Sequence, residues 1–443
     1  MKRSTGTTLL PVRKATMRIC IVNEFFYPDN TGGTGTVLSD LVRSLRQIDP
    51  DLEIDVVTSN NLYRRAHTKL AAFENWNGVA IHRLPAPHPN SLPMALRLGA
   101  NLLFCVSAFS KLLSLRPYDM VLIGTAPPMA AMTVQALSQV RKTPFVYIVY
   151  DLEPDRSVAM KVLPEKHLFV QVFRAAQKRW LNSAARVIVL GEYMGEYLTR
   201  TYGVPPQRIV AIPIGSNPEE IVPGPKASRF RAQHGIQGFL VLYSGNFGRY
   251  HNFDTVLDAA RILRDTHPQI SFALVGDGAQ KSHIVQRVTE EALTNVRLFE
   301  FVAKADYADL LASADLSFVT LEPGMEGLCV PSKFYSILAS GRPVLATVSP
   351  LSEVARVIDE AQAGVHMEQS AIDLLVDAVV ALSENPAQAE QMGRNARRVL
   401  EEQYSVNEVA RQYYAVLRAA SQPPQPTPLA VSALTPADPT SKK

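Results

Sequence analysis

Short apolar runs alternate with helix-like stretches along most of the chain, and this alternation constrains the fold more than any other feature. Continuously apolar runs occur at 17–23 ("MRICIVN") and 144–150 ("PFVYIVY"), and helical spacing of apolar residues lies between such runs, for example over 36–48 and 164–184. Buried strands that alternate with helices are typical of a parallel sheet with helices on both faces. The pattern therefore predicts an α/β fold.

The same pattern starts again after a predicted linker at 222–228 ("VPGPKAS"), which holds two prolines and a glycine. Strand-like runs return at 239–245 and 270–276. We therefore expect two doubly wound, Rossmann-like domains, an N-terminal one over 17–222 and a C-terminal one over 229–403. Ligands of such sheets bind beyond the carboxyl ends of the strands, so the cleft between two facing domains is the expected active site.

The ends of the chain differ from this body. Residues 1–16 are polar and basic, and residues 421–443 are rich in Pro, Ser and Thr, so both segments are predicted to be disordered tails. The last long helix, predicted at 404–420, is expected to pack back onto the first domain.

Charge and cysteine content bear on partners and location. Residues 1–222 hold 25 Lys and Arg against 17 Asp and Glu, whereas the remainder holds 20 against 24. A mildly basic first half suits an anionic acceptor or a membrane surface, with ordinary surface charge as the alternative, and no nucleic-acid partner is expected. The three scattered cysteines and the lack of a secretory apolar segment favour a cytoplasmic location, and no metal-ligand spacing is present.

One apolar run, at 92–115, carries Arg97 and Lys111 and is judged too interrupted to span a membrane. It is interpreted either as a core helix or as an amphipathic helix that faces the membrane. The second interpretation is the more specific hypothesis, and it predicts contact with the inner face of the plasma membrane.

Glycine-rich junctions between strands and helices are candidate phosphate sites, because backbone N–H groups and the helix dipole attract anions there. The first junction, "FYPDNTGGTG", contains Gly32 and Gly33. The second, "YSGNFGRYHNFDTVLDAA", gathers Asn246, Arg249 and His251 after a buried strand. An arginine there could bind a phosphate through two hydrogen bonds.

Two more junctions follow in the second half. In "ALVGDGAQK", Gly276 and Gly278 flank Asp277, which is interpreted either as a helix cap or as a ligand contact. In "GMEGLCVPSKFYSILASGRPV", Ser332 precedes a predicted helix that stops at a glycine, and Lys333 lies in its first turn. In the first half, a polar loop at 151–156 that includes Asp151 is expected to face the cleft.

The ordered set "FYPDNTGGTG", "YSGNFGRYHNFDTVLDAA", "LVGDG" and "EGLCVPSKFYSILASGRPV" resembles the retaining family-4 glycosyltransferases, which have the two-Rossmann-domain (GT-B) fold. The resemblance covers about 17–420, and the "VPSK" form is similar to bacterial members that build surface polysaccharides and lipid-linked oligosaccharides. It implies a nucleoside-diphosphate sugar bound mainly by the second domain, a glycan or lipid-linked acceptor bound mainly by the first, and no cofactor or metal.

The resemblance also implies roles for single residues. Gly32 and Gly33 would lie near the donor phosphates, and Glu326 would match the first of the two glutamates that flank the sugar and the ribose. The second glutamate falls on Ser336, and the usual Arg and Lys of the second junction fall on Asn246 and His251. These replacements put the usual ribose contact in doubt.

The mechanism implied by the resemblance is sugar transfer to an acceptor hydroxyl with retained anomeric configuration. Arg249, Lys333 and helix N-termini would stabilise the leaving diphosphate, and the diphosphate would help to take the acceptor proton. Glu326 and Asp151 complete the candidate catalytic set. Two alternatives remain: a nucleotide-sugar 2-epimerase of the same fold, and a non-catalytic protein that binds nucleotide sugars or polysaccharide.

Overall fold

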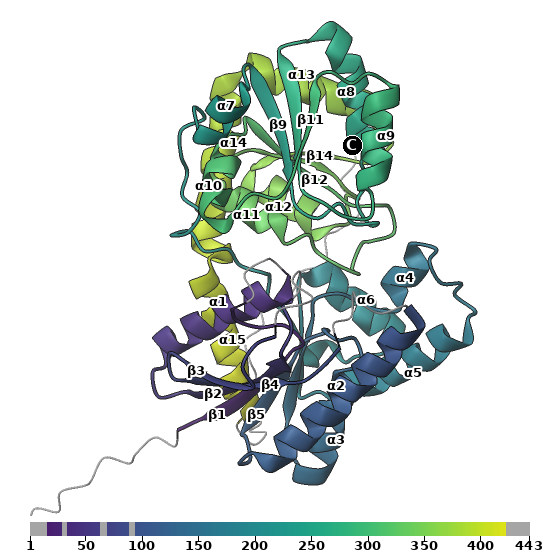
Figure 1. The fold of residues 1–443 in the computed structure, drawn as a ribbon, viewed down its shortest axis with the longest axis vertical. Coiled ribbons are helices and arrows are strands. Elements are labelled where there is room, and N and C mark those ends of the chain that lie inside the picture. The colour runs from purple at the N-terminus through teal and green to yellow at the C-terminus, as the bar shows by residue number, and fades with distance from the viewer. Residues whose placement is uncertain (1–15, 29–32, 63–68, 88–93, 422–443) are drawn as a thin grey trace, which may run out of the picture.

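The computed structural model describes residues 16–28, 33–62, 69–87 and 94–421 and arranges them in two α/β domains (Figure 1). Each domain is built on a mainly parallel sheet covered by helices, so the predicted fold class is confirmed. Gly32 and nearly all of both predicted tails lie outside the described residues.

The first domain has an eight-stranded sheet in the order β3-β4-β2-β1-β5-β6-β7-β8. Only the β3–β4 pair is antiparallel among its described pairs. Its strands are β1 (Arg18–Val22), β2 (Glu53–Ser59), β3 (Phe73–Trp76), β4 (Val79–Leu84), β5 (Met120–Ile123), β6 (Phe145–Val149), β7 (Arg186–Val189) and β8 (Ile209–Ala211). Its helices are α1 (Thr34–Ile48), α2 (Met94–Ser114), α3 (Ala131–Arg141), α4 (Asp155–Ala159), α5 (Leu168–Ser183) and α6 (Glu192–Tyr202), with a 3₁₀ turn at Pro206–Arg208.

The second domain has a six-stranded parallel sheet in the order β11-β10-β9-β12-β13-β14. Its strands are β9 (Phe239–Ser244), β10 (Ile270–Val275), β11 (Val296–Phe299), β12 (Leu316–Thr320), β13 (Val344–Thr347) and β14 (Gly364–Met367). Its helices are α7 (Arg229–His234), α8 (Asp254–Thr266), α9 (Lys281–Glu290), α10 (Lys304–Ala312), α11 (Lys333–Ser340), α12 (Glu353–Ala361), α13 (Ile372–Glu384) and α14 (Pro386–Val399).

The chain then returns to the first domain. A π-helical turn at Leu400–Tyr404 leads into α15 (Val406–Ser421), which lies along α1 (Figure 1). Two hydrogen bonds fix this packing, from Ser44 Oγ to Asn407 Oδ1 at 2.9 Å and from the Tyr414 hydroxyl to Asp49 Oδ2 at 2.5 Å. The chain therefore passes between the domains twice, once in each direction.

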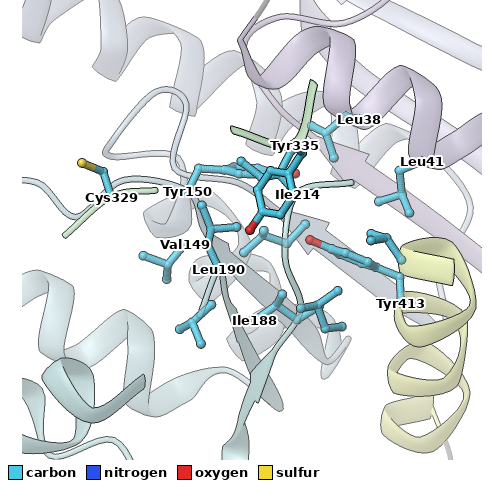
Figure 2. Packing of buried hydrophobic residues seen from close by; sticks show 14 of the residues in the cluster. Leu38, Leu41, Val149, Tyr150, Ile188, Leu190, Ile214, Cys329, Tyr335 and Tyr413 are labelled. Atoms are coloured by element: carbon cyan, nitrogen blue, oxygen red, sulfur yellow. The ribbon is translucent and has the colours of Figure 1, made fainter. Parts of the chain in front are cut away.

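An apolar core continues from one domain into the other. Figure 2 shows Tyr335 and Cys329 of the second domain packed near Tyr150 of β6's carboxyl end, with Tyr413 of α15 beside them. All four side chains are buried. A second apolar cluster, between the second sheet and helices α8 and α13, belongs to the second domain alone. Burial of the shared cluster therefore holds the two domains in the orientation that forms the cleft.

Helix α2 carries the apolar run noted in the sequence. Its segment Leu96–Ser114 is long enough and apolar enough to cross a membrane. This finding corrects the sequence-based interpretation that charged residues interrupt the run too much for it to span a membrane. Only 22% of that segment is buried, and the helix packs against α3, β2 and β4 as one layer of the first domain. A domain helix of this kind passes the same test, so the finding is weak evidence for a span.

Glycines allow two loops to touch beyond the carboxyl ends of β9 and β10. A Cβ atom on Gly276, where φ is +154°, would lie 1.9 Å from the carbonyl oxygen of Gly245. A Cβ atom on Gly278, where φ is +151°, would lie 2.6 Å from the carbonyl oxygen of Phe247. Both glycines are therefore required by close backbone approach and by a conformation that other residues rarely adopt.

One acidic residue is buried directly after the central strand β1. The backbone of Glu24 is fixed by hydrogen bonds to Ala126 O at 2.7 Å and from Ser59 N at 3.0 Å. Its side chain is 9% exposed, and burial raises the pKa of its carboxyl to about 7. No ion pair of Glu24 occurs among the described residues, so nothing there offsets the cost of ionising it.

We expect Gly276→Ala to destabilise the second domain by about 3 kcal/mol, because the new methyl group would clash with the backbone carbonyl of Gly245, which is fixed at the end of β9. Its thermal transition should fall by roughly 6–12 °C. Gly99→Ala on α2 is the matched control, since no atom lies within 4 Å of its added Cβ. Equal melting temperatures for the two variants, measured by circular dichroism, would contradict this account of the loop packing.

Glu24 predicts a pH dependence of stability. A carboxyl whose pKa is raised on folding makes the folded state less stable as the pH rises from its unfolded pKa, about 4.5, to its folded pKa, about 7. Glu24→Gln should therefore leave the melting temperature almost unchanged at pH 4 and stabilise the protein at pH 8, by on the order of 3 kcal/mol. The exposed Glu219 supplies the control variant Glu219→Gln. Parallel pH profiles for both variants and the wild type would show that Glu24 is not desolvated.

Candidate active site

The candidate site lies where the carboxyl edge of the second sheet faces the first domain. Three loops meet there, the loop after β9 (245–253), the loop after β10 (276–280) and the long loop between β12 and α11 (321–332). The last of these loops touches the first domain directly, because Leu152 N–H donates to Leu328 O at 3.0 Å. The site is therefore assembled from both domains.

Lys333, the first residue of α11, points back to the end of β9. Its ammonium group lies 3.9 Å from the centre of the Tyr243 ring and hydrogen-bonds the Tyr243 hydroxyl. Its side chain runs along Gly245, where an added Cβ would approach Lys333 Cε to 2.9 Å. Burial lowers the pKa of Lys333 well below its ordinary value, and no carboxylate pairs with it among the described residues. An anionic ligand would supply the missing countercharge.

His251 is buried beneath the contact between Lys333 and Tyr243. The side chain is 2% exposed, and its Nδ1 accepts a hydrogen bond from Gly248 N–H at 3.3 Å and lies 3.0 Å from the Tyr243 hydroxyl. Burial and the nearby Lys333 charge lower the pKa of His251 well below its ordinary value, so the ring is neutral. His251 is thus buried and orders the loop, and the predicted donor contact through this residue stays a prediction.

The other residues of these two loops face solvent. Asn246, Arg249 and Asp277 are exposed, and Arg249 makes no ion pair with any described carboxylate. Asp277 Oδ1 accepts from Gly278 N–H at 2.9 Å, which is a local turn contact. Gly276 and Gly278 have the packing role given above. Their contacts with a donor stay predictions.

The start of α11 is open. Ser332 is exposed and its side chain makes no capping hydrogen bond, and Gly341 ends the helix in the left-handed conformation with φ +66°. Ser336, one turn further, is half-buried and faces the phenol of Tyr307 on α10. The helix boundaries expected from the sequence are therefore met, and Ser336 lies on the side of α11 that turns toward α10.

Glu326 is half-buried in a narrow cleft between the domains. Glu353, at the start of α12, is 7% exposed in the same cleft, and its Oε2 lies 2.5 Å from where a Cβ on Gly191 would stand. The cleft is lined by Gly191, Tyr193 and Met194 of the first domain and by Leu321, Glu322, Met325, Glu326, Gly327, Cys329, Val330, Ser349, Ser352 and Glu353 of the second.

Asp151 is paired rather than free. Its Oδ2 lies 2.8 Å from Nη1 of Arg156, whose guanidinium is 5.5 Å from the ring centre of Tyr250 in the second domain. The backbone of Asp151 also forms a β-bridge with Cys329. The loop at 151–156 thus faces the cleft as expected, and Asp151 contributes there to a contact between the domains.

The remaining candidates are only partly described. Gly33 begins α1 as an exposed residue with φ +75°, while Gly32 lies outside the described residues. In the described part of the chain, no group of three or more His, Cys, Asp or Glu is placed to hold a metal ion.

Two residues near the site, and the buried Glu24 of the first domain, were not singled out from the sequence. Tyr243 and Tyr307 lie in an ordinary apolar strand and an ordinary helix, and only the fold brings them to Lys333 and Ser336. Glu24 did carry a signal, since an acidic residue directly after a continuously apolar central strand falls at the ligand-binding edge of the sheet.

Comparisons with known proteins agree with this geometry. A family model described as glycosyl transferase 4-like domain matches residues 32–215, and one described as glycosyl transferases group 1 matches residues 226–399. The chain is 29% identical over 297 residues to the protein named probable glycosyltransferase WbjE of Pseudomonas aeruginosa (65% of this chain, 71% of that one). It is 25% identical over 280 residues to WcaI of Escherichia coli K12, named for colanic acid biosynthesis (61% and 67%).

Solved structures share the fold. A sucrose-phosphate synthase from Thermosynechococcus elongatus superposes with a TM-score of 0.73 at 18% identity, over 91% of this chain and 98% of that one. HepE of Anabaena, solved in complex with UDP-glucose, superposes with a TM-score of 0.68 at 17% identity, over 91% and 100%. None of the comparisons favours the epimerase alternative. The two family models together cover most of both domains, and the chain therefore belongs to the retaining family-4 glycosyltransferases.

Proposed function

We propose that this glycosyltransferase uses a nucleoside-diphosphate sugar, with a uridine nucleotide as the first candidate, and that Lys333 binds the diphosphate. The observation that carries the proposal is the enclosed Lys333 ammonium at the carboxyl end of β9, which pairs with no carboxylate of the described residues. Support for uridine comes from HepE, a protein of the same fold whose structure holds UDP-glucose. The glycine loop beside Lys333 leaves room for phosphate oxygens close to the backbone.

In the proposed reaction, the bond between the anomeric carbon and the diphosphate breaks while the acceptor hydroxyl forms a new bond on the same face. Negative charge grows on the leaving diphosphate, where Lys333 and the open N-terminus of α11 stabilise it. The acceptor proton passes to the leaving phosphate. Glu326, in the interdomain cleft, orients the sugar.

The acceptor is proposed to be a cell-surface glycan or its lipid-linked precursor, as the name of the relative WcaI suggests. A lipid-linked acceptor would make membrane contact useful. Five apolar side chains of α2 are 45–58% exposed, and these are Leu96, Leu98, Leu102, Leu103 and Val106. At the start of α5, Leu168 and Val172 are also exposed. We propose that α2 rests on the inner face of an anionic membrane.

Lys333→Met should weaken UDP binding roughly 10- to 100-fold, the cost of one hydrogen bond to a charged group. The free enzyme holds Lys333 at a lowered pKa, and the diphosphate favours the charged form. Binding should therefore take up protons, and wild-type affinity should fall as the pH rises above the lowered pKa of Lys333 in the free enzyme. Calorimetry in buffers of different ionisation enthalpy measures both effects.

Lys226→Met is the control, since Lys226 pairs with Asp315 just before β12, at the edge of the second sheet opposite these loops. Wild-type UDP affinity in Lys333→Met, in a protein that melts normally, would refute the role of Lys333.

Membrane contact predicts that Leu102→Asp with Val106→Asp abolishes co-sedimentation with phosphatidylglycerol vesicles, because charges on an apolar face oppose insertion. Leu374→Asp, which changes an exposed leucine of the second domain, should leave sedimentation intact. Wild-type binding should fall with salt. A wild type that does not pellet with these vesicles at low salt would contradict the proposed membrane contact of α2.

A further inference from the structure

An open cavity of about 510 Å³ lies at the amino edge of the second sheet. Asp315 and Pro343, which line it, stand directly before β12 and β13, so the cavity is at the opposite end of these parallel strands from the candidate active site. Gly341, which ends α11, also lines the cavity, whereas Lys333 begins that helix, about 12 Å away along its axis. Binding sites for small molecules have volumes of roughly 300–1,000 Å³. The cavity is therefore large enough for a small molecule and separate from the proposed donor site.

The walls of this cavity include both segments that connect the two domains. Residues 223–226 belong to the linker of the first crossing, and Glu401 belongs to the π-helical turn of the second. The guanidinium of Arg397 on α14 donates to the carbonyls of Pro218 and Ile221, at 3.0 and 2.7 Å. The same guanidinium pairs with Glu401 at 2.6 Å. A ligand in this cavity would thus touch the elements that link the domains.

Positive charge exceeds negative charge in the lining of the cavity. Two of its ion pairs are internal, since Lys226 lies 2.9 Å from Asp315 and Arg397 lies 2.6 Å from Glu401. Glu390 is the remaining acidic residue of the lining. The basic residues of the lining that pair with no described carboxylate are Arg342, Arg394 and Arg398. Three cations against one carboxylate leave an excess of two positive charges, which favours an anionic ligand.

Arg342 keeps unused hydrogen-bond donors. Its Nη2 donates to the carbonyls of Gly224 and Ala312, at 2.6 Å each. Among the described residues, its Nε is buried without a hydrogen-bond partner, and its Nη1 makes no hydrogen bond either. Burial lowers the pKa of this guanidinium below its ordinary value, as expected for a cation without a paired carboxylate. An anion in the cavity would supply the missing countercharge.

Arg394 and Arg398 present two more guanidinium groups on α14. They are four residues apart, so they lie on one face of the helix, and both are exposed. Arg394 donates to the neutral side-chain oxygen of Gln391 at 2.6 Å, and the Arg398 side chain makes no hydrogen bond or ion pair with any described residue. A guanidinium fork matches the oxygens of a phosphoryl group, because it can donate two parallel hydrogen bonds. A phosphorylated ligand therefore suits this lining better than a neutral one.

We propose that the cavity binds a small molecule that carries two phosphoryl groups, such as a sugar bisphosphate, at a site distinct from that of the nucleotide-sugar donor. Two phosphoryl groups offer enough acceptors for three guanidinium groups, and the volume leaves room for the sugar that joins them. The inference does not depend on the identity of the donor. A ligand bound there would hold residues 223–226 of the linker against α14.

The test measures the binding of fructose 1,6-bisphosphate by calorimetry to the full chain carrying Lys333→Met, which removes the cation of the proposed donor site. Saturable binding is expected. Arg394→Ser with Arg398→Ser should weaken it roughly 10- to 100-fold, because hydrogen bonds between charged groups are lost. Affinity should fall as the salt concentration rises. Succinate should bind more weakly than the bisphosphate, because a carboxylate carries less negative charge than a phosphoryl group.

Arg116→Ser with Arg179→Ser is the matched control, because it removes two exposed arginines of the first domain and with them the same total charge. This control should keep the affinity, and circular dichroism and melting temperature should show that both double variants are folded. The inference falls if fructose 1,6-bisphosphate does not bind saturably, if succinate binds equally well, or if the two double variants bind alike. The proposed function is tested separately by UDP binding to the wild type, so it stands or falls independently of these results.

Discussion

The apolar core shared by the two domains is the constraint on which the rest of the structure depends. Tyr335 and Cys329, from the elements that build the second domain's site, are packed against the carboxyl end of β6 in the first domain (Figure 2). The chain crosses between the domains twice, and α15 ties the end of the second domain onto α1. Because these contacts bury large aromatic side chains, the loop that carries Glu326 is held against residues 151–152. The cleft is thus a consequence of core packing rather than of loop contacts alone.

Within that frame, the site is organised around one enclosed ammonium group. The Lys333 ammonium lies over the face of the Tyr243 ring instead of in water. The Tyr243 hydroxyl donates a hydrogen bond to the Asn246 carbonyl at 2.7 Å and lies 3.0 Å from His251 Nδ1. A protonated His251 would place a second positive charge beside Lys333, so the ring must stay neutral. The bare backbone at Gly245 makes space for the lysine stem. One buried cation therefore explains the residue types at several neighbouring positions.

Much of this could be predicted from the sequence, and the limits have physical causes. The α/β class and the start and stop of α11 follow from local signals, namely continuous apolar strands and a helix bounded by Ser332 and Gly341. Lys333 could be singled out as a candidate because a basic residue in the first turn of a helix, at the carboxyl edge of a parallel sheet, suits an anionic ligand. Its partner Tyr243, 90 residues away, was not, because a tyrosine in an apolar strand gives no sign of which way its hydroxyl points. The burial of His251 and the approach of Tyr307 to Ser336 also depend on how helices pack, which local patterns do not encode.

The serine at 336 and the low pKa of Lys333 belong to one electrostatic arrangement. A carboxylate three residues along the same helix face would lie on the order of 5 Å from the ammonium group and would stabilise its charge by about 3 kcal/mol at an effective dielectric constant of 20. Lys333 would then be an ion-paired lysine in the empty enzyme, and a diphosphate would have to compete with that carboxylate. With Ser336 and Tyr307 in its place, the neighbourhood is polar but uncharged, and burial keeps the lysine pKa low until an anion arrives. Under the proposed function, the donor diphosphate supplies the negative charge that the described side chains around Lys333 lack.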